Sequence, residues 1–77
     1  MEESSPADRA AVFARATGLS ARETEVLQHL IAGADTRTVA ASMFLTENTV
    51  QDHLKSIFAK TATRSRRVLL SRVAGTA

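Results

Sequence analysis

The spacing of the apolar residues constrains the fold of this chain more than any other feature of its sequence. They recur at steps of three and four residues, as on one side of a helix, and nowhere alternate as in a half-buried strand. The two clearest stripes consist of Val26, Leu27, Leu30 and Ile31, and of Val50, Leu54, Ile57 and Phe58. A chain of 77 residues has room for one thin core around such stripes. The sequence therefore predicts an all-α fold.

A first helix is predicted between Pro6 and Gly18. Ser5 can cap this helix, Pro6 suits its first position because the missing N–H costs nothing there, and Gly18 can end it in the left-handed conformation. We assign residues 1–18 to an N-terminal extension or linker helix. Its expected inner side carries Val12, Phe13 and Ala16.

Capping signals predict further helices within residues 19–77, the main domain. Ser20 and Glu23 have the spacing of a capping box, in which each residue satisfies a backbone N–H group of the other. A short third helix is expected to begin at Asp35 or Thr36, because either side chain can cap it.

The third and fourth predicted helices form a helix-turn-helix unit. Only Phe44 and Leu45 separate the third helix from Thr46, the N-cap of a fourth helix over about residues 46–61. A last helix covers about residues 65–74. In such units the second helix enters the major groove of DNA. The pattern therefore predicts a four-helix helix-turn-helix domain with an additional short N-terminal helix.

The outer side of the fourth helix carries side chains that can pair with base edges. Gln and Asn pair with adenine, Lys pairs with guanine, and a carboxylate accepts from the cytosine amino group although phosphates repel it. The candidate base contacts are Asn48, Gln51, Asp52 and Lys55. Hydroxyl and basic side chains near them can hold phosphates, together with the N–H groups of the helix start. The candidate phosphate contacts are Thr46, Thr49, His53, Lys60 and Arg64.

Charge is divided unevenly along the chain. Residues 1–35 carry six acidic and three basic side chains, a net charge of −3, whereas residues 36–77 carry two acidic and seven basic ones, a net charge of +5. A small domain polarised in this way can turn a positive side toward a polyanion. Double-stranded DNA is therefore the predicted partner.

Four motifs in the right order resemble those of the LuxR-type helix-turn-helix domain. They are LSARETEVL at residues 19–27, the Ala-Gly pair at 32–33, LTENTVQDHL at 45–54 and Arg-Ser-Arg at 64–66. The resemblance covers nearly all of residues 19–74, and it implies a four-helix fold, a role in bacterial transcription regulation and dimerisation through the last helix. Matched position by position, it places Gln51, Asp52 and Lys55 at bases, and Thr46, Thr49 and His53 near phosphates.

The chain departs from that family just after the fourth helix. The family usually has Lys-Leu-Gly-Val where this chain has Lys60, Thr61, Ala62 and Thr63, so two apolar anchors and a helix-ending glycine are absent. A left-handed conformation at Ala62 would cost on the order of 1 kcal/mol. We therefore expect a reshaped or mobile turn.

The last predicted helix contains three consecutive apolar residues, Val68, Leu69 and Leu70, which a helix spreads over about 200° of its circumference. We expect Leu70 and Val73 to face the core with Leu69 at the edge, which leaves Val68 pointing outward. A two-fold dimer places two recognition helices about 34 Å apart on DNA. We therefore expect a homodimer through this helix, with the interface residues Val68, Ser71 and Arg72.

Other classes of function find less support in the sequence. The chain has no cysteine, and His29 and His53 lack metal-ligand spacing, so no metal, cofactor or small-molecule ligand is expected. No nucleophile stands in a recognisable setting with a base, so the chain is not expected to be an enzyme. No apolar run approaches the roughly 20 residues that span a bilayer, and we expect a cytoplasmic, nucleoid-associated protein. RNA polymerase is a second candidate partner. Two alternatives remain open: a promoter-reading region like that of a sigma factor, and a helical protein-interaction module that does not bind DNA.

Overall fold

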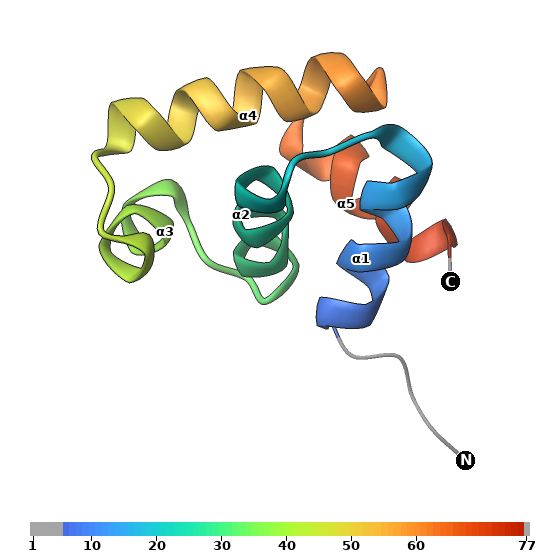
Figure 1. Ribbon diagram of the computed structural model, residues 1–77, viewed down its shortest axis with the longest axis horizontal. Coiled ribbons are helices and arrows are strands. Elements are labelled where there is room, and N and C mark those ends of the chain that lie inside the picture. The colour runs from blue at the N-terminus through green and yellow to red at the C-terminus, as the bar shows by residue number, and fades with distance from the viewer. Residues whose placement is uncertain (1–5, 77) are drawn as a thin grey trace.

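The computed structural model describes the backbone of residues 6–76 and the side chains of residues 8–75. All regular elements of this part are helices (Figure 1): α1 (Pro6–Thr17), α2 (Ala21–Ile31), α3 (Thr36–Met43), α4 (Glu47–Thr61) and α5 (Arg66–Thr76). The predicted all-α fold, with four helices after a short N-terminal one, is confirmed. Ser5, the expected cap of α1, lies outside the described residues.

The predicted capping residues begin three of these helices. Each accepts a hydrogen bond from the backbone N–H three residues further on, and these caps are Ser20, Asp35 and Thr46. The structure thus selects Asp35 over Thr36 as the start of the third helix. The expected left-handed glycine follows α1, where Gly18 has a φ of 77°.

One hydrophobic core joins all five helices. It contains Phe13 from α1, Leu27 and Leu30 from α2, Val39 from α3, Ile57 from α4 and Leu69 from α5. Because α1 packs against α2 and α5 around this core, the fold does not divide at residue 18. The segment expected as an extension or linker helix is packed into the domain.

The buried side of α1 differs from the expected one. Ala10, Phe13 and Ala14 are buried, whereas Val12 is 53% exposed and Ala16 is also exposed. The observed set follows the steps of three and four residues that one helix side requires. Alanine can pack closely against a neighbouring helix, but its small side chain is a weaker sign of the buried side than the larger Val12. The prediction therefore followed Val12 and not Ala10 and Ala14.

The rotation of α5 also differs from the predicted one. Leu69 and Val73 are fully buried, whereas Leu70 is only partly buried against the core. The central pair is therefore separated by four residues and not by three. Val68 points outward as expected and is 44% exposed. In a run of three apolar residues, the way α5 packs against α1 decides which of the three is fully buried in the core.

Between residues 6 and 76, two residues other than glycine adopt the left-handed conformation. Ala62 ends α4 with a φ of 56°, so it adopts the strained conformation at the position of the missing family glycine. Phe44 ends α3 with a φ of 58°, and its side chain is 95% exposed. This conformation costs a residue with a Cβ atom about 1 to 2 kcal/mol. The turn between α3 and α4 and the turn after α4 therefore both carry backbone strain.

Hydrogen bonds replace the missing apolar anchors after α4. Thr61 and Thr63 are both buried, and their hydroxyl oxygens lie 2.8 Å apart. The Thr61 hydroxyl donates to the Ile57 carbonyl oxygen at 2.8 Å, so the hydroxyl proton between the two threonines comes from Thr63. Arg72 of α5 donates to the Thr61 carbonyl oxygen at 3.0 Å. These bonds hold the turn after α4, for which the sequence predicted a reshaped or mobile path.

This chain of bonds predicts a strongly non-additive pair of substitutions. Thr61→Val removes the acceptor of the Thr63 hydroxyl and leaves that group buried without a partner, at a cost of about 1 to 3 kcal/mol. Thr63→Val leaves the Thr61 bond to Ile57 intact and should be nearly neutral. The double variant should recover most of the loss, because no polar group stays unsatisfied. Urea unfolding measures all four proteins, and additive effects would contradict this hydrogen-bond order.

Candidate nucleic-acid interface

The α3 and α4 helices form the predicted bihelical unit. They pack against each other and are joined by the short turn at Phe44 and Leu45. Val50, Leu54 and Ile57 anchor the inner side of α4 in the core. Figure 1 shows α4 lying across one side of the molecule, with the other helices beneath it. The opposite side of α4 is left uncovered.

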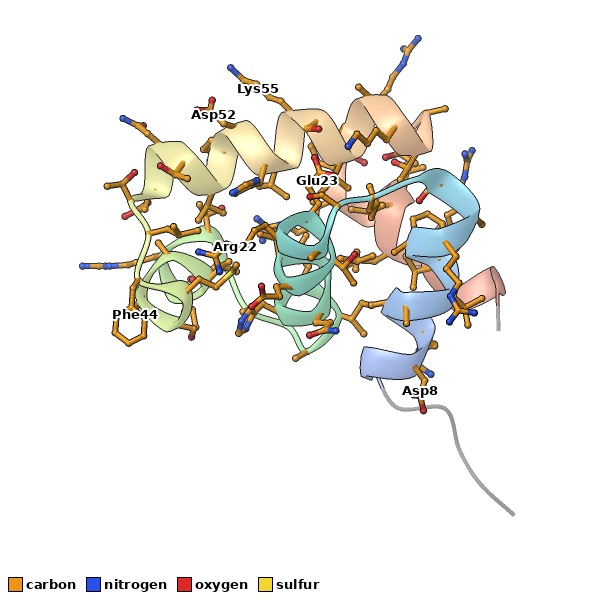
Figure 2. All side chains as sticks on the ribbon, in the orientation of Figure 1. Asp8, Arg22, Glu23, Phe44, Asp52 and Lys55 are labelled. Carbon is orange, nitrogen blue, oxygen red and sulfur yellow. The ribbon has the colours of Figure 1, made fainter. Side chains whose placement is uncertain are left out.

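The four candidate base contacts share this uncovered side. Asn48, Gln51, Asp52 and Lys55 are all exposed. Figure 2 shows Asp52 and Lys55 pointing away from the helices below α4. The structure therefore brings together, on one helix, the donors and acceptors that can meet base edges.

The candidate phosphate contacts at the start of α4 are organised around its cap. The Thr46 hydroxyl oxygen accepts from the Thr49 backbone N–H at 3.1 Å and lies 2.9 Å from the Thr49 hydroxyl oxygen. Since the mutual bond uses one of the two hydroxyl protons, the other can donate to a phosphate oxygen. His53 is half-buried on the side of the helix, and Arg64 is exposed in the link to α5.

Lys60 occupies a different setting from the one expected. Its ammonium group donates to Glu23 Oε1 at 2.8 Å, so it forms an ion pair with α2. The same carboxylate accepts from the Ser20 backbone N–H and from the Ser56 hydroxyl. Lys60 therefore has a structural partner, and a phosphate contact would compete with that ion pair.

The Glu23 carboxylate is held in its charged form. Burial raises its pKa, but the hydrogen bonds from Lys60, Ser20 and Ser56 outweigh burial and lower the pKa from 4.5 to about 2. Figure 2 places Glu23 at the end of α2 nearest α4. The carboxylate thus links the capping box of α2 to the C-terminal half of α4 and helps to set the position of the candidate recognition helix.

Sequence reasoning missed this link, although it identified Glu23 as part of the capping box. Ser56 and Lys60 are 33 and 37 residues further along the chain. Both lie along one side of α4, at a spacing of four residues. That spacing was the only local sign that the two side chains could share a partner on another helix.

A second unpredicted contact ties α5 to α3. Arg66 donates to the Thr36 hydroxyl at 3.0 Å. The neighbouring Asp35 has a lowered pKa because its carboxylate accepts hydrogen bonds from Thr38, with a smaller effect of Arg37 and Arg66. Arg37 is exposed in the first turn of α3. It is a basic residue of the helix-turn-helix unit that the predicted site did not include.

The expected dimer residues differ in whether they already have a bonding partner within the domain. Val68 is 44% exposed, and Ser71 is exposed. Arg72 is already bonded to the Thr61 carbonyl oxygen within the domain. Val68 is therefore the exposed apolar residue that α5 could place at the centre of a dimer interface, whereas Arg72 stabilises the turn after α4 in its own domain.

Between residues 6 and 76 no group of three or more His, Cys, Asp or Glu side chains is placed to hold a metal ion. None of the helices α1 to α5 is long and apolar enough to cross a membrane.

Comparisons with known proteins match most of this region. A family model described as "Bacterial regulatory proteins, luxR family" matches residues 17–73. The chain is 44% identical over 48 residues to the probable csgAB operon transcriptional regulatory protein of Salmonella typhimurium and to the CsgBAC operon transcriptional regulatory protein of Escherichia coli. The match covers 62% of this chain and 22% of each relative. No solved structure matches the chain.

Proposed function

Because the chain belongs to the luxR family of bacterial regulatory proteins, we propose that it binds double-stranded DNA sequence-specifically and regulates transcription. The observation that carries this proposal is the uncovered side of α4, where Asn48, Gln51, Asp52 and Lys55 are exposed together. These side chains offer both donors and acceptors, which base reading requires. The curated relatives, whose printed names call them transcriptional regulatory proteins, support the regulatory role.

In this proposal α4 lies in the major groove, and the groups around it hold the DNA backbone. The nearest candidates for phosphate contacts are two groups. One is the hydroxyl proton that the bond between Thr46 and Thr49 leaves free, and the other is the exposed Arg64 side chain. Arg37 adds a positive charge at the start of α3. Because the two acidic residues of α4, Glu47 and Asp52, cancel the charge of its two lysines, most of the attraction to DNA must come from these flanking groups.

Binding should weaken steeply with salt. If about four phosphates are neutralised, counterion release should lower the affinity on the order of a hundredfold between about 50 and 200 mM salt. Arg64→Ala should reduce the slope of this dependence by about one unit for any duplex sequence. Fluorescence titration with a random duplex measures both. An affinity that does not change with salt would contradict DNA binding and favour the helical protein-interaction module.

Within the same proposal the protein acts as a homodimer through α5, with Val68 at the centre of the interface. Its support is the exposure of Val68 on a helix whose Leu69 and Val73 are used in the core. Two-fold symmetry would present two copies of α4 to successive turns of the groove. One exposed valine gives a weak contact in solution that shared DNA would strengthen.

The remaining parts of the proposal follow from a role at promoters. The chain acts by binding and not by catalysis, and it works in the cytoplasm on nucleoid DNA. RNA polymerase is the protein partner expected there. A promoter-reading region like that of a sigma factor finds less support, because the family match extends through most of α5, to residue 73.

A further inference from the structure

Asp52 is the charged residue of α4 that lies furthest outward. The buried residues Val50, Leu54 and Ile57 define the inner side of the helix. At about 100° per residue, Asp52 lies about 200° around the axis from Val50, almost opposite the middle of that buried stripe. Figure 2 shows its side chain pointing straight away from the domain. A groove that receives the outer side of α4 receives this carboxylate first.

No side chain between residues 8 and 75 forms an ion pair with the Asp52 carboxylate. The nearby acidic residues with basic partners are Glu25, paired with Arg22, and Glu23, paired with Lys60. Lys55 lies three residues after Asp52 on the same side of α4, yet the two do not form an ion pair. A bare carboxylate facing DNA is repelled by the phosphates of every sequence. Its place on the recognition helix therefore calls for a compensating contact that only some sequences supply.

Base chemistry identifies that contact. In the major groove guanine presents two acceptors, thymine presents an acceptor and a methyl group, and adenine presents an acceptor beside its amino group. Cytosine presents its amino donor alone. We infer that Asp52 accepts a hydrogen bond from one cytosine amino group in each half-site and rejects the other three bases there. This inference rests on the proposed DNA-binding function.

Such a residue acts on specificity more than on affinity. The repulsion from phosphates weakens binding to all duplexes, whereas the amino group offsets it at one base pair only. Glu47 provides a comparison on the same helix. It is exposed in the first turn of α4, where a negative charge is favourable to the helix dipole, so its presence has a local structural reason. Asp52, in the second turn, has no such reason.

The test selects bound sequences from a random duplex pool with the parent protein, Asp52→Ala, Asp52→Asn, Glu47→Gln and Lys55→Ala. We expect Asp52→Ala to bind all duplexes more tightly but to lose a preference for cytosine, on the order of tenfold, at one position of the half-site. Asp52→Asn should shift that position toward adenine. Glu47→Gln should raise general affinity with every preference kept.

A modified duplex then tests the atom itself. Replacing the selected cytosine by a pyrimidinone base, which lacks the amino group, should weaken binding of the parent about tenfold and leave Asp52→Ala unaffected. Unchanged preferences in Asp52→Ala would overturn the inference. A second outcome would also overturn it: Asp52→Ala and Lys55→Ala lose the base preference at the same position, and the parent binds the pyrimidinone duplex at full affinity. Asp52 would then act by orienting Lys55. A parent protein without salt-dependent binding removes the proposed function, and the inference with it.

Discussion

Glu23→Gln should lower the free energy of unfolding at neutral pH by about 2 to 3 kcal/mol, which corresponds to a fall in Tm of roughly 10 to 20 °C for a domain of this size. The Glu23 side chain is only 7% exposed, and its carboxylate accepts from the Ser20 backbone, Ser56 and Lys60 at once. A neutral amide cannot replace a charge that serves three donors. Thermal and urea unfolding measure the loss.

Glu25→Gln is the matched control for this substitution. Glu25 lies in the same helix and contacts Arg22 at 3.5 Å, but both side chains are about half exposed. Exposed pairs of this kind contribute about 0 to 1 kcal/mol, so the control should unfold nearly like the parent. If the two variants lose equal stability, the link between α2 and α4 has no special role.

The contribution of Glu23 should also depend on pH. Because its pKa in the folded protein is about 2, against an ordinary 4.5, the stabilisation is fully present above about pH 5. It is lost as the pH falls from there toward 2, since the unfolded chain takes up the proton first. The stability difference between the parent and Glu23→Gln should therefore shrink in this window. A constant difference down to pH 3 would contradict the lowered pKa.

Val68→Glu should abolish cooperative binding to paired half-sites and spare binding to a single half-site. Val68 is outside the core, so the fold should stay intact. In a two-fold interface the substitution places two like charges at the centre of one small contact, where their repulsion adds to the lost apolar burial. The affinity for a full site should then fall by on the order of tenfold to a hundredfold, as the gain from joining two half-sites disappears.

Val12→Glu is the control for that experiment, because Val12 is a similarly exposed valine on α1. It should leave both the half-site and the full-site affinity unchanged. Sedimentation and DNA titration compare the two variants. If Val68→Glu pairs on full sites as well as the parent, the α5 interface is wrong. If Val12→Glu loses pairing in its place, α1 forms the dimer surface.

Features that arise from local chemistry could be predicted from the sequence alone. Helical spacing of the apolar residues predicted the five helices. Ser20 and Thr46 marked two of their starts, and Asp35 or Thr36 a third, because a cap needs only a side chain and an N–H group three residues away. The outer side of α4 followed from the same spacing, since the buried stripe leaves the opposite side to solvent. The missing glycine marked Ala62 as a position of strain, although the sequence did not decide its conformation.

Features that depend on how the helices dock became clear only in the three-dimensional structure. Periodicity defines a stripe on a helix, but the rotation that buries Leu69 in place of Leu70 is set by packing against α1. Likewise a capping glutamate has two carboxylate oxygens, and nothing near Glu23 in the chain reveals that α4 brings Ser56 and Lys60 to them. The ion pair of Lys60 with Glu23 was therefore not predicted, and the phosphate contact predicted for Lys60 would compete with it. Contacts between residues more than 30 positions apart depend on the relative placement of two helices, which neither helix encodes alone.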